Sequence, residues 1–236
     1  AYTPTMPHWG YNGCSRRYWD FLYGGKLSRI ERQLHHYGSG MNAVPLLTHF
    51  RDNPGDLFLL QVGYGGMMGA ISAIDQEGFG SCAFHSFPST LKWDAYSGDY
   101  GPNFFGHTWN TGTYLVKTPD FGWQAYGGEV SAKGKRLSLK PQDSYRKRVY
   151  LAHLGLYLTL DSGVFDMVEV DLASGRVLAK LAEGSGKAKT LRLRVEQPGQ
   201  VAGVGAYSVN GALKEDAGAF LVPMRSGRSQ VVLTAK

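Results

Sequence analysis

Cysteine is scarce in this chain of 236 residues, and the spacings that define common metal sites are missing. The two cysteines, Cys14 and Cys82, can form neither a CxxC metal site nor a framework of several disulfides. A single disulfide in an oxidising compartment and two buried thiols both remain open. The pair His35 and His36 lacks the HExxH pattern, and no other spacing of His, Asp or Glu indicates zinc. We therefore expect no metal and no cofactor.

Long apolar runs are also missing. No stretch of about 18 apolar residues occurs, which excludes a transmembrane helix, and we expect no membrane partner. There is no GxSxG nucleophile elbow and no P-loop, and the glycine-rich segments lack the βαβ context of a dinucleotide site. Nucleic acid is not expected as a partner, because the basic half of the chain has few aromatic residues.

The residues that are abundant divide the chain into two parts. The 14 Tyr, 11 Phe and 5 Trp bury too much surface for a disordered chain. Residues 1–112 hold 7 Lys or Arg and 8 Asp or Glu, whereas residues 113–236 hold 18 and 11. The first part also has six of the seven histidines. Such a shift in composition marks a domain boundary, so we predict domains at 1–112 and 113–236.

The second part has the pattern of an antiparallel β-sandwich. Its short runs alternate apolar and polar residues or are β-branched, and turn sequences such as Asp161-Ser-Gly and Asn210-Gly separate them. The predicted strands are 149–160, 164–172, 176–181, 190–195, 203–209, 219–223 and 230–234.

The first part has the apolar spacing of short helices joined by glycine-rich loops. The predicted helices are 15–23, 27–37, 41–51, 57–62 and 67–74. The sequence Asn53-Pro-Gly-Asp is expected to open the fourth helix, and Gly65-Gly66 to end it. Paired short helices indicate part of an (α/α) toroid. The predicted fold class is therefore α+β multidomain, with the C-terminal part of an (α/α) toroid followed by an antiparallel β-sandwich.

Four segments (7–12, 61–66, 75–88 and 93–110) combine aromatic residues with His, Asn and acids. An aromatic ring covers the C–H face of a pyranose while polar side chains bond its hydroxyls, so these segments predict a sugar-binding cleft. The alternative is that the rings fill the core between helices. The predicted sugar-binding residues are His8, Trp9, Tyr11, Asn12, Trp93, Tyr100, Asn103, His107 and Trp109.

Carboxylates in the same segments suggest a reaction. Two carboxylates across a cleft can serve glycoside hydrolysis as proton donor and as base or nucleophile, whereas the alternatives for each acid are helix capping and surface ion pairing. Histidine as base and tyrosine as acid would instead suit a polysaccharide lyase. The predicted catalytic residues are Asp75, Glu77, Asp99, His85 and Tyr64.

As a set, the segments PHWGYNG, RQLHHYGSGMNAVPLL, IDQEGFGSCAFHSFP and SGDYGPNFFGH resemble an uncharacterised bacterial family of six-hairpin-glycosidase-like carbohydrate-active enzymes. The resemblance covers roughly residues 1–130. It implies an (α/α) toroid joined to β-sandwich modules, export to the periplasm or beyond, and action on a poly- or oligosaccharide. It brings no assigned catalytic residues. The chain has too few helices for a whole toroid, so we expect a larger N-terminal chain or segment to complete it.

These observations predict the C-terminal portion of a glycan-cleaving enzyme. A glycoside hydrolase is favoured because acids crowd the predicted cleft. The basic second part would suit an anionic polymer, which keeps a polysaccharide lyase open. A carbohydrate-binding or structural subunit without catalysis is the third hypothesis.

Overall fold

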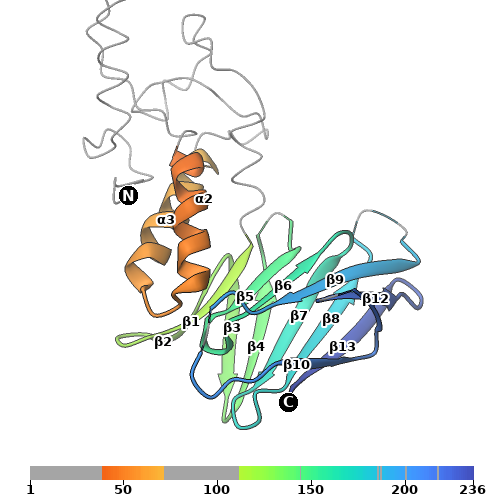
Figure 1. The fold of residues 1–236 in the computed structure, drawn as a ribbon. Helices are drawn as coiled ribbons and strands as arrows, with labels where there is room; N and C mark the ends of the chain where they lie inside the picture. The colour runs from red at the N-terminus through yellow and green to blue at the C-terminus, as the bar shows by residue number, and fades with distance from the viewer. Residues whose placement is uncertain are drawn as a thin grey trace, which may run out of the picture. The chain divides into compact units, whose positions relative to one another are not determined.

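The computed structural model describes residues 39–71, 112–143, 145–184, 186, 188–199, 201–216 and 218–236. By its contacts the chain divides into two compact units, Ala1–Phe50 with Asp56–Thr111 and Arg51–Gly55 with Gly112–Lys236. The described part of the first unit is helical, and the second unit consists mainly of strands (Figure 1). Neither described helix is long and apolar enough to cross a bilayer.

The first unit contains α3 (Leu57–Ile71) and all but the last two residues of α2 (Ser39–Asp52). The predicted helix 41–51 is confirmed as part of α2. The Asp56 carboxylate accepts a hydrogen bond from the Leu59 backbone N–H over 3.2 Å and so caps the start of α3. The sequence Asn53-Pro-Gly-Asp therefore opens a helix, as predicted.

The prediction of two separate helices at 57–62 and 67–74 is wrong, because α3 is continuous through its glycines. A Cβ atom on Gly63 would lie 2.9 Å from Leu47 Cγ on α2, which is closer than real Cβ atoms come. Gly63 therefore allows the two helices to approach each other closely and does not end one of them.

The described residues of the second unit form thirteen strands. They are β1 (Thr113–Thr118), β2 (Gly122–Tyr126), β3 (Gly128–Lys133), β4 (Arg136–Pro141), β5 (Arg148–Leu151), β6 (Leu156–Leu160), β7 (Val164–Asp171), β8 (Val177–Ala182), β9 (Thr190–Glu196), β10 (Tyr207–Asn210), β11 (Leu213–Asp216), β12 (Ala219–Pro223) and β13 (Arg228–Ala235).

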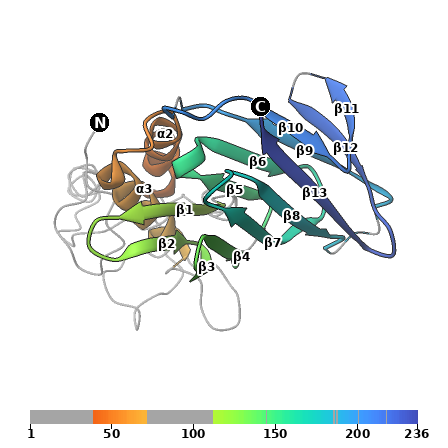
Figure 2. The ribbon, with the colours of Figure 1, turned by 90° about the horizontal axis from the view of Figure 1, so that it is seen from below.

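These strands form two sheets. The seven-stranded sheet has the order β11-β12-β9-β6-β5-β1-β2, and the six-stranded sheet has the order β10-β13-β8-β7-β4-β3 (Figures 1 and 2). Among the pairs within these sheets, β1 and β5 run parallel and the others antiparallel. We predicted an antiparallel β-sandwich, and the parallel pair of β1 and β5 corrects that prediction.

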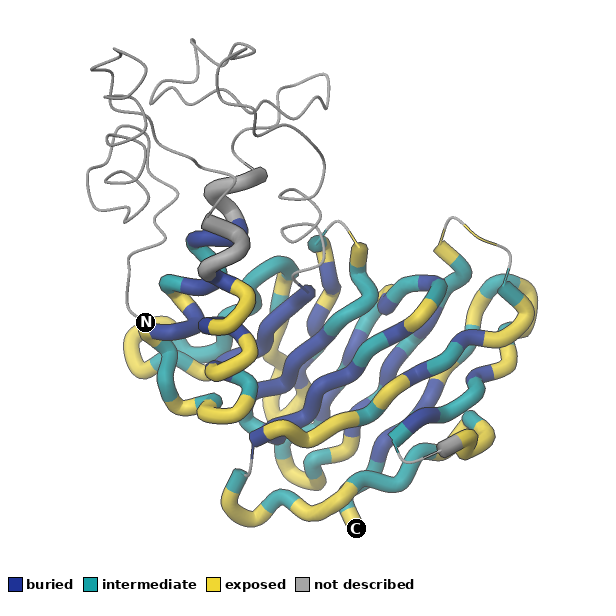
Figure 3. Tube along the Cα trace, turned by 45° about the horizontal axis from the view of Figure 1, so that its top comes forward, coloured by how far each residue is buried: buried dark blue, intermediate teal, exposed yellow. Residues whose placement is uncertain are grey.

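One apolar core belongs to the two sheets together. Along β8, Val177, Ala179 and Leu181 are buried while the residues between them are half-buried, and the same alternation is visible along other strands in Figure 3. Successive side chains of a strand point to opposite faces, so one face of each sheet supplies the core. The buried cluster combines residues of both sheets, from Leu115 and Val149 to Val168 and Leu233. This makes the unit a β-sandwich.

The predicted fold class is wrong in its helical part. The described residues are mostly strand, and their only α-helices are α2 and α3, so no part of an (α/α) toroid is present among them. The composition of residues 113–236 indicated strands correctly. The inference of paired toroid helices failed because glycines taken as helix ends lie inside α3.

Strand 149–160 was also predicted as one element and is two. A 3₁₀ turn (Ala152–Leu154) separates β5 from β6, and Gly155 closes that turn with φ of 56°. A Cβ on Gly155 would lie 2.5 Å from the Gly199 carbonyl oxygen, so both the conformation and the space require glycine.

Candidate functional site

Of the predicted site residues, the structure describes only Tyr64, which is half-buried in α3. The other predicted catalytic and sugar-binding residues lie outside the described residues, as do both cysteines. They are Asp75, Glu77, His85, Asp99, His8, Trp9, Tyr11, Asn12, Trp93, Tyr100, Asn103, His107 and Trp109. The described part of the chain holds no group of three His, Cys, Asp or Glu residues that could bind a metal ion.

A row of tyrosines crosses the seven-stranded sheet on the face away from the core. Tyr126, Tyr114, Tyr150 and Tyr157 are successive partners on β2, β1, β5 and β6. The rings of Tyr114 and Tyr150 meet edge to face with centres 5.9 Å apart, and those of Tyr150 and Tyr157 with centres 6.2 Å apart. Such pairs stabilise a sheet beyond the area that they bury.

Arg51 packs onto this row. Its guanidinium carbon lies 4.5 Å from the centre of the Tyr157 ring, and its Nη1 lies 3.5 Å from the Tyr114 hydroxyl. The Tyr150 hydroxyl donates a hydrogen bond to the Arg51 carbonyl oxygen over 2.8 Å. A cation over an aromatic ring and a satisfied buried hydroxyl are both stabilising arrangements.

Tyr114 and Tyr150 are not poised for proton transfer at neutral pH. Burial raises the pKa of Tyr114 to about 12, against the opposing effect of the Arg51 charge. Burial raises the pKa of Tyr150 as well. Both hydroxyls therefore stay protonated, and we interpret the Arg51–tyrosine cluster (Arg51, Tyr114, Tyr150 and Tyr157) as a structural element.

A second polar region has a different character. A hollow of about 550 Å³ lies where the chain passes from β12 to β13, and we call it the cationic hollow. Three cations and one carboxylate line it, together with polar and apolar groups. Its lining residues are Asp166, Lys180, Leu181, Gly211, Pro223, Arg225, Arg228, Ser229 and Gln230.

Arg225 and Arg228 face each other across a tight turn. Each donates its backbone N–H to the carbonyl of the other, over 2.9 and 3.1 Å. Between them, Ser226 and Gly227 have φ of 49° and 75°, which is the pattern of a type I′ turn. Residues paired in this way have Cα atoms about 5.5 Å apart and side chains on the same face. The turn therefore places both arginine side chains on one face, and both line the hollow.

These two arginines are exposed, and within the described part of the chain neither has an ion-pair partner. The third cation, Lys180, is neutralised by Glu169, whose carboxylate lies 2.5 Å from its Nζ. The Glu183 carboxylate lies beside Gly227 at the turn itself, since a Cβ there would be 3.2 Å from Glu183 Oε2.

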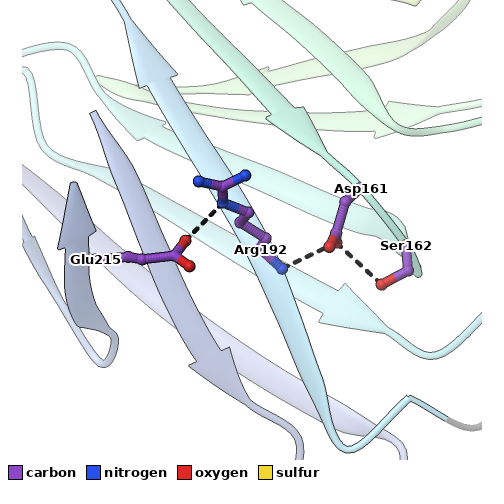
Figure 4. A network of polar contacts seen from close by, with 4 residues as sticks. All are labelled: Asp161, Ser162, Arg192 and Glu215. Atoms are coloured by element: carbon purple, nitrogen blue, oxygen red, sulfur yellow. Dashed lines mark hydrogen bonds and ion pairs between the residues drawn. The ribbon is translucent and has the colours of Figure 1, made fainter. Parts of the chain in front are cut away.

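Arg192 on β9 shows how the same fold neutralises an arginine. Its Nε lies 2.6 Å from Glu215 Oε2. Its backbone N–H donates to Asp161 Oδ1, which also accepts a hydrogen bond from Ser162 (Figure 4). The absence of such a partner at Arg225 and Arg228 is therefore a local property of the turn.

His153 is a third unusual group. Both of its ring nitrogens are buried, and neither has a hydrogen-bond partner in the structure described here. The Trp123 ring meets it edge to face, with ring centres 4.8 Å apart. Burial lowers the pKa of His153 from 6.5 to about 4, so the ring is neutral at pH 7. A neutral histidine whose two nitrogens make no hydrogen bond to the described residues does not by itself make a catalytic site.

Sequence reasoning missed the Arg51–tyrosine cluster and the cationic hollow. The signal for the first was a tyrosine near the start of three apolar segments, at 114, 150 and 157. The signal for the second was an Arg-Ser-Gly-Arg turn sequence, which indicated the turn but not the charges gathered around it.

The fold and these sites define a β-sandwich protein with a basic hollow at a strand turn. Residues 1–232 match the model of a family of unknown function, DUF5695, and the chain belongs to that family. No curated protein and no solved structure matched the chain. The likeness to six-hairpin glycosidases is therefore a prediction, and its toroid is the part that the described fold contradicts.

Proposed function

We propose that the chain is part of an exported glycan-cleaving enzyme and that its β-sandwich binds an acidic glycan. One observation carries this proposal, the cationic hollow with its two exposed arginines that lack carboxylate partners in the described chain. The excess of Lys and Arg over Asp and Glu in residues 113–236 also attracts acidic polymers, and it acts over a longer distance.

Except for Tyr64 on α3, the proposed catalytic groups lie in aromatic segments outside the described residues. Asp75 and Glu77 are proposed as the acid and the base or nucleophile of a glycoside hydrolase, with His85, Asp99 and Tyr64 nearby. Support comes from the sequence alone, where these acids stand among glycines and aromatic residues. The proposal places the enzyme in the periplasm or outside the cell, together with a larger N-terminal chain or segment.

A polysaccharide lyase is the second candidate, and the basic hollow favours it. Lyases act on uronate-containing polymers, and an acidic polymer is what the hollow would hold. In the predicted segments, histidine would remove the proton and tyrosine would protonate the leaving oxygen.

The products of digestion separate these functions. The full chain is incubated with acidic and neutral polysaccharides, and new chain ends are measured. Reducing ends without ultraviolet absorbance indicate a hydrolase, and unsaturated ends that absorb in the ultraviolet indicate a lyase. If the chain binds a glycan but releases no new ends from any polymer, it is a binding subunit, and the proposal of glycan cleavage is overturned.

The variants Asp75→Asn and Glu77→Gln test the catalytic groups, because both replace a charge with little change in shape. We expect cleavage to fall by at least about 100-fold, the size of a typical acid or base contribution, with unchanged thermal unfolding. Wild-type turnover in both variants would contradict the assignment.

A further inference from the structure

The cationic hollow brings together the groups that an acidic sugar needs. We infer that it binds one uronate residue of an acidic glycan, with the carboxylate held between Arg225 and Arg228. This inference rests on the proposed glycan function and assigns its binding site.

The arginine pair is the first argument. Like charges placed directly opposite each other across two strands are destabilising, and within the described chain neither arginine forms an ion pair that would relieve this repulsion. The guanidinium group is planar and always charged, and its donors match a carboxylate two at a time. A bound carboxylate would reduce the repulsion between the two arginines and accept hydrogen bonds from both.

The charge balance of the hollow favours a ligand group with little negative charge. Glu169 already neutralises Lys180. Asp166 then opposes the two arginines, which leaves one net positive charge among the lining residues. The Glu183 carboxylate beside the turn brings the net charge of the surroundings to zero, so a ligand of high negative charge is not favoured. A carboxylate with one negative charge suits this balance better than a phosphate group, which carries more.

The other lining groups suit the rest of a sugar ring. Asp166 lies at an irregularity of β7, where the pairing with β8 shifts between Phe165 and Met167. Such bulges re-aim a side chain, and here the exposed Asp166 carboxylate lines the hollow and can accept from sugar hydroxyls. Gln230 can both donate and accept there. The exposed ring of Pro223 adds an apolar surface.

The size of the hollow is also appropriate. Its volume of about 550 Å³ lies within the range of small-ligand sites, roughly 300–1,000 Å³. It is partly open to solvent, as binding one unit of a longer polymer requires.

The test uses titration calorimetry on the full chain, with a chelator present to exclude bridging by calcium. The probes are short oligomers of galacturonate, mannuronate and glucuronate-containing hyaluronan, and the matched neutral probe is the galacturonate oligomer with its carboxyl groups reduced to alcohols. We expect at least one uronate oligomer to bind and the reduced oligomer to bind at least about tenfold more weakly, because charged hydrogen bonds are lost.

The variant Arg225→Gln/Arg228→Gln should weaken uronate binding by at least about tenfold. The control variant Arg176→Gln/Arg194→Gln removes the same charge from two exposed arginines outside the hollow. It should change affinity by less than about threefold, because salt screens distant charges. The variant Arg225→Lys/Arg228→Lys should recover only part of the affinity, because lysine lacks the paired donors.

Each contrary result identifies what has failed. Equal loss in the hollow and control variants would show non-specific attraction and overturn the site. Competition by inorganic phosphate at concentrations at which acetate does not compete would overturn the choice of a carboxylate. Binding of the neutral oligomer alone would overturn the inference and the preference for an acidic glycan, while leaving the proposed glycan cleavage standing. Binding of no glycan at all, acidic or neutral, would overturn both.

Discussion

The second unit contains two arginine sites that are built in opposite ways. Arg51 lies over the Tyr157 ring, approaches the Tyr114 hydroxyl, and its carbonyl accepts the Tyr150 hydroxyl. Arg225 and Arg228 are exposed on a two-residue turn, and within the described chain they face each other without a carboxylate partner. One site satisfies its polar groups internally, and the other leaves two charges for a ligand.

The contrast between these two sites distinguishes structural from functional polar groups in this fold. Tyr114 and Tyr150 are fully buried, and they lie in a row set by strand pairing, so removing one leaves a cavity. Removing an exposed arginine from the turn leaves no cavity. We therefore expect stability to respond strongly at the Arg51–tyrosine cluster, and ligand binding to respond at the cationic hollow.

The largest expected effect is at Tyr150. The variant Tyr150→Ala should lower the free energy of unfolding by about 3–5 kcal/mol, as loss of a buried aromatic ring does. The control Tyr150→Phe keeps the ring and loses only the hydrogen bond to Arg51, and should cost about 1 kcal/mol. Urea unfolding of the full chain measures both. Equal costs for the two variants would show that the hydroxyl, and not the ring, holds the cluster together.

His153 should give an intermediate effect that depends on pH. Its pKa of about 4 in the folded chain lies below the ordinary 6.5, so between these values the unfolded chain binds a proton that the folded chain refuses. The free energy of unfolding therefore falls as the pH falls from 6.5 to 4, by at most about 3 kcal/mol from this group. No further loss from His153 is expected below pH 4.

Replacing His153 tests that slope. The variant His153→Leu should lose this contribution to the pH dependence and be at least as stable as wild type at pH 7, because two buried nitrogens without partners are removed. An unchanged slope in His153→Leu would show that other groups cause it.

Much of the sandwich was accessible from the sequence, and the reasons are local. Strand β12 was predicted with its observed bounds, and β7 within one residue, because alternating apolar residues lie between glycine turns. Strands β1 to β4 were missed. Lysine and serine interrupt the apolar residues of β3 and β4, and β3 begins with Gly128, where a Cβ would meet the Lys140 carbonyl oxygen at 2.6 Å.

The sites were less accessible, because they depend on long-range pairing. Asp166 and Arg228 are 62 positions apart in sequence and meet only because β7, β8 and β13 are neighbours in one sheet. The tyrosine row needs the parallel pairing of β1 with β5, which local patterns do not reveal. A pattern of residues predicts which face a side chain takes, but not which strand lies beside it.

The smallest expected effect is the change in stability when Arg228 loses its charge. The variant Arg228→Gln should raise the free energy of unfolding by about 0.3–0.5 kcal/mol, because it relieves repulsion from Arg225 across the turn. The matched variant Arg192→Gln should lower it by about 0.2–1 kcal/mol, because it breaks a partly exposed ion pair with Glu215. Thermal unfolding at low and high salt measures both, and added salt should shrink the two effects. If Arg228 belongs to a binding site, Arg228→Gln should gain stability and lose affinity for uronate. Destabilisation by Arg228→Gln would mean that its charge serves the fold, and the two arginine sites would then no longer differ in kind.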